Sequence, residues 1–291
     1  MKSYEYGIEY ASARATPELV GRRKILGIIE NAIESKNKKV QVIYITAIGG
    51  MGKTRLLEEV VKLWNRRSRA QKEAKILIVS HLVDLYHTHT HDPEGLMDEI
   101  VNVLGKKHFK KYLEQRAALI HMKYEKGETP SDALKQEMID TFVDELNLLG
   151  QKYDKVVLVF DTAEVLRYQK DPSQTVLGLM DSLTTTALWM MQLIKRLQNV
   201  TVLIAGRPPE IPTMSDELLG NLNKTGAKVA PYPLPGFELE ETLDYFKVMV
   251  KATRKENLQS AKRIQSIPEE TRRIIHELTQ GAPFVLALLI D

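Results

Sequence analysis

The sequence predicts an α/β fold in which a mostly parallel sheet is flanked by helices. Three runs of β-branched and aromatic residues carry this prediction, at residues 40–46, 156–160 and 200–205. Runs this apolar are typical of strands that are buried on both faces of a parallel sheet. Between the runs, apolar residues recur at helical spacing, and from Phe237 onward only helical patterns remain. We therefore also expect a small C-terminal helical lid.

The first apolar run leads directly into a glycine cluster. Residues 47–54 have the sequence AIGGMGKT, and a helical pattern begins at Arg55. Glycines let the backbone curl so that its N–H groups point at one anion, and a helix N-terminus adds the positive end of its dipole. A strand, a glycine loop, Lys-Thr and a helix form the phosphate-binding P-loop of NTPases. A turn that merely joins a strand to a helix is the alternative, which the lysine, the hydroxyl and the flanking elements disfavour.

The residue types of this loop predict a nucleotide and Mg²⁺ as ligands. Lys53 places a mobile cation against the β- and γ-phosphates, and Thr54 offers a hydroxyl to Mg²⁺. The full pattern has a glycine where Ala47 stands, a departure that bears on loop geometry more than on phosphate binding. The loop residues expected to contact the nucleotide are Gly49, Gly50, Met51, Gly52, Lys53, Thr54 and Arg55.

An aspartate ends the second apolar run, in the sequence VVLVFDTAE. At the end of a buried strand, Asp161 can reach Mg²⁺ directly or through water, which is the Walker B arrangement. Glu164 follows three residues later and can orient the attacking water. The alternative is a helix N-cap at Asp161 with Glu164 as its capping-box partner. With a P-loop present, we predict that Asp161 is linked to magnesium and that Glu164 is catalytic.

An arginine follows the third apolar run. If this strand lies beside the strand that ends at Asp161, Arg207 can reach the γ-phosphate and sense whether it is present. An exposed turn arginine is the alternative. We favour the sensor by position and count Arg207 with Lys53, Asp161 and Glu164 as the candidate catalytic residues.

Composition and turn-forming residues divide the chain into three parts. We expect a leader at residues 1–15, a P-loop NTPase domain at residues 16–230 and a helical lid at residues 231–291. Pro231, Pro233 and Pro235 mark the predicted linker before the lid. Because the chain stops just inside this lid, we expect the lid to be incomplete at its C-terminal end.

The composition limits the compartment and the partners. The 291 residues carry a net charge of +3, which is too small to argue for nucleic acid by itself. The absence of cysteine excludes disulfides and Cys-ligated zinc. The N-terminus has no apolar signal core, and no apolar run is long enough to span a bilayer. We expect a cytoplasmic protein without a membrane partner.

Two polar segments allow a second interpretation. His87, His89 and His91 alternate after an apolar run at residues 75–83 that predicts a strand, and alternating histidines could bind a metal. We favour a polar loop, because side chains that alternate along an extended chain cannot all face one ion. The basic stretch at residues 106–126 is typical of a solvated helix face, with a surface for nucleic acid as the minority interpretation.

Five segments, taken in order, resemble the STAND class of signalling P-loop ATPases, relatives of AAA+ ATPases with NACHT-like or NB-ARC-like cores. They are LVGRR, AIGGMGKT, VVLVFDTAE, LIAGRP and the late GAP. The resemblance implies that the turn formed by Val20, Gly21 and Arg22 lies against adenine and ribose, and that Pro283 contacts the nucleotide. Without the resemblance, Gly21 indicates only a glycine turn before a helix. Gly281 and Pro283 indicate only a C-cap glycine followed by a helix-starting proline.

The resemblance also implies a mechanism. Such proteins rest with ADP in a closed core and lid, exchange it for ATP, and self-associate through their NTPase domains. Many members carry a second acidic residue directly after the Walker B aspartate, and Thr162 stands there in this chain. We therefore predict a Mg²⁺-dependent ATPase that hydrolyses ATP slowly and acts as a signalling switch. The alternatives are an AAA+ DNA-binding or loader ATPase and a nucleotide-binding interaction module without turnover.

Overall fold

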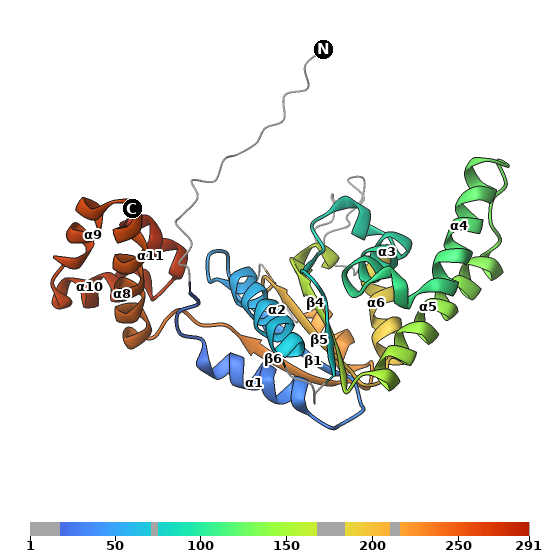
Figure 1. The fold of residues 1–291 in the computed structure, drawn as a ribbon, viewed down its shortest axis with the longest axis horizontal. Helices are drawn as coiled ribbons and strands as arrows, with labels where there is room; N and C mark the ends of the chain where they lie inside the picture. Colours follow the sequence, from blue (N-terminus) through green and yellow to red (C-terminus); the bar gives the residue numbers. More distant parts are fainter. Residues whose placement is uncertain (1–17, 71–74, 168–183, 210–215, 291) are drawn as a thin grey trace, which may run out of the picture. The chain divides into compact units, whose positions relative to one another are not determined.

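The computed structural model describes residues 18–70, 75–167, 184–209 and 216–290, which fold into two compact units (Figure 1). Within the described residues, unit 1 combines residues 18–23, Ile48–Leu56 and residues 234–290. Unit 2 combines Lys24–Ala47 and Leu57–Pro233. The glycine loop and the first turn of the helix after it therefore belong to the same unit as the C-terminal helices.

The sheet lies in unit 2, and the strand pairings in its described part are all parallel. Its strand order is β2-β4-β5-β1-β6, and β3 also pairs with β4. The strands are β1 (Gln41–Thr46), β2 (Ile76–Ile78), β3 (Val83–Asp84), β4 (Lys155–Asp161), β5 (Val200–Gly206) and β6 (Lys228–Pro233). Every residue of β4 and β5 is buried, so both faces of the sheet are covered there. The predicted α/β P-loop fold is confirmed.

Helices precede β1 and fill most of the connections between the strands (Figure 1). They are α1 (Arg23–Glu34), α2 (Lys53–Ala70), α3 (Pro93–Leu104), α4 (Lys110–Tyr124), α5 (Asp132–Lys152), α6 (Thr185–Arg196) and α7 (Glu217–Asn223). Short 3₁₀ segments are η1 (Thr88–His91), η2 (Lys106–His108) and η3 (Ala163–Arg167). Ser131 is the N-cap of α5, and its side chain accepts a hydrogen bond from the Leu134 N–H.

Three sequence predictions about elements need correction. The predicted strand at residues 75–83 is two short strands, β2 and β3. Pro231 and Pro233, interpreted as a linker, lie within β6, which ends the strand order and so leaves one side unpaired, where the missing proline N–H costs little. Apolar residues at helical spacing predict a helix over residues 175–197. The helix α6 starts at Thr185, after the N-cap Thr184, and the predicted part before residue 184 lies outside the described residues.

Unit 1 contains helices and the glycine loop. Its helices are α8 (Leu239–Glu256), α9 (Leu258–Gln265), α10 (Glu269–Thr279) and α11 (Pro283–Ile290). A capping box between Glu238 and Glu241 starts α8. The core of the unit consists of Val20, Phe237, Tyr245, Met249, Leu286 and Ala287. The helical pattern predicted from Phe237 onward is confirmed, although the eight residues of α9 bury only two apolar side chains.

The predicted leader at residues 1–15 lies outside the described residues. The domain boundaries remain a prediction, since the compact units divide the chain differently and place Ile48–Leu56 with the C-terminal helices. Among the described helices, none is long and apolar enough to cross a membrane.

Candidate nucleotide-binding site

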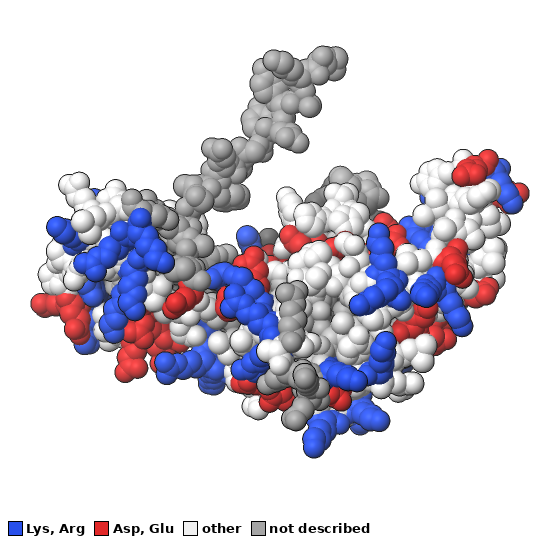
Figure 2. All heavy atoms as spheres, in the orientation of Figure 1, with Lys and Arg blue, Asp and Glu red and all other residues white. Residues whose placement is uncertain are grey.

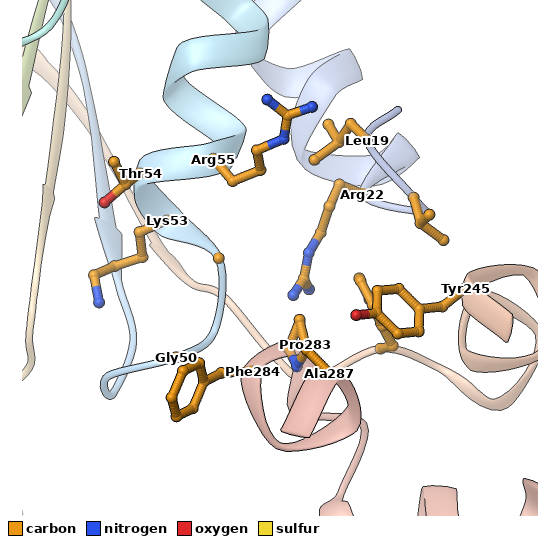
Figure 3. A pocket seen from close by; sticks show the side chains of 13 residues that line it. Leu19, Arg22, Gly50, Lys53, Thr54, Arg55, Tyr245, Pro283, Phe284 and Ala287 are labelled. Carbon is orange, nitrogen blue, oxygen red and sulfur yellow. The ribbon is translucent and has the colours of Figure 1, made fainter. Parts of the chain in front are cut away.

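Unit 1 contains a partly open cavity of about 340 Å³ next to the glycine loop (Figure 3). Four segments that are distant in the sequence line it: the turn before α1, the loop with the start of α2, Phe237 with α8, and α11. The lining residues are Leu19, Val20, Arg22, Gly50, Gly52, Lys53, Thr54, Arg55, Phe237, Tyr245, Pro283, Phe284 and Ala287. Of the predicted nucleotide contacts, Gly21, Gly49 and Met51 do not line this cavity.

The glycine loop has the backbone that an anion-binding turn requires. Gly50 has φ +80° and Gly52 has φ +84°, left-handed values that favour glycine. A Cβ on Gly50 would also lie 2.8 Å from the Cβ of Phe284. Ala47 is not among the residues with positive φ, and it is buried. Its methyl group therefore causes no backbone strain at the position where the full motif has glycine.

The first turn of α2 carries the predicted cationic and hydroxyl groups. The helix starts as the Leu56 N–H donates to the Gly52 carbonyl at 3.0 Å. The Lys53 ammonium donates to the Ile48 carbonyl at 3.2 Å. Figure 3 shows Lys53 and Thr54 on one side of this turn and Arg55 on the other, the side of Leu19. Lys53 thus lies over the loop whose N–H groups it would assist in binding phosphate.

Arg22 is held by protein groups on several sides. Its side chain is buried, and its guanidinium donates to the Pro235 carbonyl at 2.6 Å and to the Met51 carbonyl at 2.9 Å. The same guanidinium lies 4.8 Å from the centroid of the Phe237 ring. The Arg22 N–H donates to the Glu241 carboxylate at 2.8 Å. Arg22 therefore links the glycine loop to the segment that begins α8.

The turn that presents Arg22 needs glycine before it. Gly21 has φ +66°, and Arg22 itself has φ +67°, which is uncommon for a residue with a Cβ. A Cβ on Gly21 would lie 2.4 Å from the Glu241 carboxylate. The prediction that this turn matters to the site rested on family resemblance, and its contacts with Glu241 and Pro235 had no signal in the sequence.

The N-terminal end of α11 contacts the loop. The Phe284 N–H donates to the Gly50 carbonyl at 3.1 Å, and Pro283 lines the cavity beside Phe284 (Figure 3). Phe237 and Tyr245 are buried and give the cavity apolar walls. The cavity therefore combines a phosphate-type loop at one end with aromatic surface, the lining that cofactor sites commonly have.

In unit 2, the carboxyl ends of β4 and β5 carry the other three candidate residues. Asp161 ends β4 and is buried, and the Thr162 N–H donates to its carboxylate at 2.9 Å. Thr162 has φ +59°, so the chain turns sharply directly after the aspartate. Asp84, at the end of β3, lies opposite Asp161 in the parallel register.

Glu164 and Arg207 contact each other. The Arg207 N–H donates to Glu164 Oε2 at 3.0 Å, and its Nε lies 3.2 Å from Glu164 Oε1. The glutamate side chain is 16% exposed and the arginine side chain is 65% exposed. The carboxylate is thus oriented by the neighbouring strand, while most of the guanidinium stays accessible. In the capping-box alternative, Glu164 would accept a hydrogen bond from the backbone N–H of Asp161. The structure gives it a partner on the neighbouring strand, Arg207.

A buried arginine, Arg167, connects segments near the carboxyl ends of β4 and β5. No sequence motif indicated this role. Arg167 donates to the Arg207 carbonyl at 2.9 Å, forms an ion pair with Asp216 at 2.8 Å, and donates to the Tyr44 hydroxyl. Burial raises the pKa of Tyr44 well above its ordinary value, so the phenol stays protonated. The three partners lie 40, 49 and 123 residues away, a pattern that no local motif reveals.

We expect Arg167→Ala to destabilise the fold by about 3 kcal/mol, because it leaves a carboxylate and a carbonyl without their buried partner. Thermal and urea unfolding of the variant measures this. Arg196→Ala is the matched control, since its ion pair with Asp140 at 2.8 Å is partly exposed and worth at most about 1 kcal/mol. Equal losses in the two variants would contradict a structural role for the buried Arg167 cluster.

The histidine segment forms the 3₁₀ segment η1 (Thr88–His91). In the described part of the chain, no group of three or more His, Asp or Glu side chains is placed to hold a metal ion. His81 and His89 each lie 3.5 Å from the carboxylate of Glu99 instead. Because this segment is a 3₁₀ turn, it is not the extended chain assumed from the sequence, and the absence of a metal there stays a prediction.

Comparisons with known proteins concern the fold alone. No family model matches the chain, and the search of curated proteins gives no match. Domain III of the Thermotoga maritima replication initiation protein DnaA is similar at 14% identity and a TM-score of 0.38, covering 94% of this chain and 92% of that one. The Aeropyrum pernix ORC2 protein gives 11% identity and a TM-score of 0.49, over 95% and 69%. A chain of the E. coli MS115-1 HORMA:CdnC:Trip13 complex gives 11% and 0.39, over 92% and 82%.

These TM-scores are all below 0.5, so the function is inferred from the residues of this chain alone. The parallel sheet with β1 between β5 and β6, followed by a glycine loop and α2, defines an α/β P-loop NTPase fold.

Proposed function

We propose that the protein binds ATP and ADP in the cavity of unit 1 and acts as a slowly hydrolysing signalling switch of the STAND class. The observation that carries this proposal is the cavity itself, where the glycine loop, Lys53, Thr54 and the lid residue Pro283 line one space. A switch requires that the lid and the phosphate loop share a ligand, and this cavity offers both to the same molecule.

The cavity fits a nucleotide in size and chemistry. Its volume of about 340 Å³ lies within the range of small-molecule sites, roughly 300–1,000 Å³. The positive-φ glycines and Lys53 suit the phosphates, and the apolar walls of Val20, Phe237 and Tyr245 suit a planar base. We propose Gly21, Gly49 and Met51 as backbone contributors and Arg55 as a further cation of the site.

For hydrolysis, we propose that Thr54 and Asp161 hold Mg²⁺, which would neutralise the phosphate charge. Asp161 suits this role because it is a buried carboxylate at the carboxyl end of a central strand. Glu164 orients the attacking water, and Arg207 senses the γ-phosphate. Arg207 occupies one acceptor position on each oxygen of Glu164, so fewer positions remain for a water. This competition supports slow turnover.

The experiment that tests the switch is identification of the nucleotide that co-purifies with the protein. The protein is denatured and its supernatant is separated by ion exchange. We expect ADP at close to one molecule per chain, because a closed lid retards its release. An empty site that exchanges ATP rapidly would contradict the switch and favour a motor or loader ATPase.

A nucleotide-binding module without turnover is the second candidate, and the contact between Glu164 and Arg207 favours it. If Glu164 serves only to hold the β5 edge, ATP binds tightly but remains unchanged after long incubation with Mg²⁺. Phosphate release measured over hours separates this candidate from a slow ATPase.

The DNA-binding alternative gains no support from the basic segment at residues 106–126. Arg116 within it is bound by Asp98 and Glu94, at 3.0 Å and 2.6 Å. Figure 2 shows both signs of charge interspersed over the region of α4 and α5 on the visible face. DNA-stimulated hydrolysis with a steep salt dependence would restore this alternative. Self-association through the NTPase domain remains part of the switch proposal.

A further inference from the structure

Three carbonyl groups of the glycine loop accept hydrogen bonds from outside the loop backbone. The Ile48 carbonyl accepts from the Lys53 ammonium at 3.2 Å, and the Gly50 carbonyl accepts from the Phe284 N–H at 3.1 Å. The Met51 carbonyl accepts from the Arg22 guanidinium at 2.9 Å. Two of these three donors come from segments outside the P-loop motif, the turn before α1 and the start of α11.

The direction of a carbonyl fixes the direction of the next N–H group. Peptide bonds in the described chain are trans, and in a trans peptide the C=O and the following N–H point in opposite directions. Binding the Gly50 carbonyl to Phe284 therefore points the Met51 N–H away from α11. Binding the Met51 carbonyl to Arg22 points the Gly52 N–H away from Arg22. These loop N–H groups are the donors that a P-loop offers to phosphate.

Arg22 is built as a rigid donor. Its side chain is 5% exposed, so water competes little for its hydrogen bonds. The guanidinium fork spans the Met51 carbonyl and the Pro235 carbonyl, and it packs against the Phe237 ring. A charged donor on the Met51 carbonyl also polarises that peptide and makes the Gly52 N–H a stronger donor. None of these contacts requires Arg22 to touch a base or a ribose.

We propose that Arg22 and the Phe284 N–H are positioning groups that set the anion-binding conformation of the glycine loop. The helical segment of unit 1 is then part of the phosphate site, although its atoms need not touch phosphate. This inference rests on the proposed nucleotide binding and deepens it. It changes the role expected for Arg22, which the family resemblance placed against adenine and ribose.

The test compares three ligands: ADP, inorganic pyrophosphate and adenosine. For Arg22→Ala we expect binding of pyrophosphate and of ADP to weaken about tenfold, the usual scale for losing a buried charged hydrogen bond, with adenosine unchanged. Arg23→Ala is the matched control, since Arg23 is the adjacent and exposed arginine, and it should bind all three ligands like the wild type. Calorimetric titration of the full chain gives each dissociation constant.

A second pair of variants addresses the α11 contact without touching Arg22. Phe284→Pro removes both the ring and the N–H, whereas Phe284→Ala removes only the ring. Proline is tolerated in the first turn of a helix, so the fold of α11 should persist, and circular dichroism checks this. We expect pyrophosphate to bind about tenfold more weakly to Phe284→Pro than to Phe284→Ala. The pair keeps the test decisive even if Arg22→Ala does not fold.

The outcomes separate this inference from the proposed function. Pyrophosphate binding that is unchanged in Arg22→Ala, or a loss confined to adenosine and ADP, overturns the positioning role and returns Arg22 to a nucleoside contact. Equal binding by the two Phe284 variants overturns the role of the Phe284 N–H. A wild-type chain that binds neither ADP nor pyrophosphate overturns the proposed function itself.

Discussion

Lys53→Ala is expected to weaken ADP and ATP binding about a thousandfold, equivalent to about 4 kcal/mol, and to abolish hydrolysis. The ammonium group is the one mobile cation that the motif places against the β- and γ-phosphates. In the structure it lies over the loop, on the Ile48 carbonyl, and an alanine leaves that place without charge. Calorimetric titration with Mg²⁺ and either nucleotide measures the loss.

The fold should survive this substitution, because alanine is the best helix former and a cation at a helix N-terminus opposes the dipole. Lys62→Ala is the matched control. Lys62 is an exposed lysine of the same helix, with only a 4.0 Å contact to Glu59. We expect it to bind both nucleotides as the wild type does. Wild-type binding by Lys53→Ala would remove the P-loop assignment, and with it the proposed function.

Local sequence was sufficient to predict the elements that carry the site. The apolar runs at residues 156–160 and 200–205 are β4 and β5, whose complete burial requires a continuous run of apolar residues. The glycine loop was predictable for a similar reason, since positive φ at Gly50 and Gly52 restricts these positions to one residue type. Such constraints act on a residue and its neighbours, so they are visible in the sequence.

Contacts between distant segments were not predictable. Arg22 contacts Pro235 and Glu241, which lie 213 and 219 residues away, and all three are ordinary residues in their own surroundings. Pro231 and Pro233 of β6 were wrongly interpreted as part of a linker. Prolines break most strands, and only the topology shows that β6 lies at the edge, where an absent N–H is tolerated. In both cases the missing information is the packing of one segment against another.

The pairing of Glu164 with Arg207 is of the same kind, and it makes Glu164→Gln the second decisive experiment. We expect ATP binding to stay within about threefold of wild type, because the substitution keeps the size of the side chain. We expect kcat to fall about a thousandfold, or about 4 kcal/mol in the barrier, because an amide cannot accept the proton of the attacking water. Phosphate release and ATP titration on the same preparation measure the two effects.

Two controls separate catalysis from the loss of the ion pair. Glu217→Gln changes an exposed glutamate of unit 2 in the same way and should leave turnover unchanged.

Arg207→Ala breaks the same ion pair but keeps the carboxylate. If Arg207 senses the γ-phosphate, this variant hydrolyses ATP more slowly. If Arg207 only restrains Glu164, hydrolysis becomes faster, because the carboxylate no longer shares its acceptor positions with the guanidinium. Full turnover by Glu164→Gln would show that Glu164 has only a structural role, which is to hold Arg207 at the end of β5.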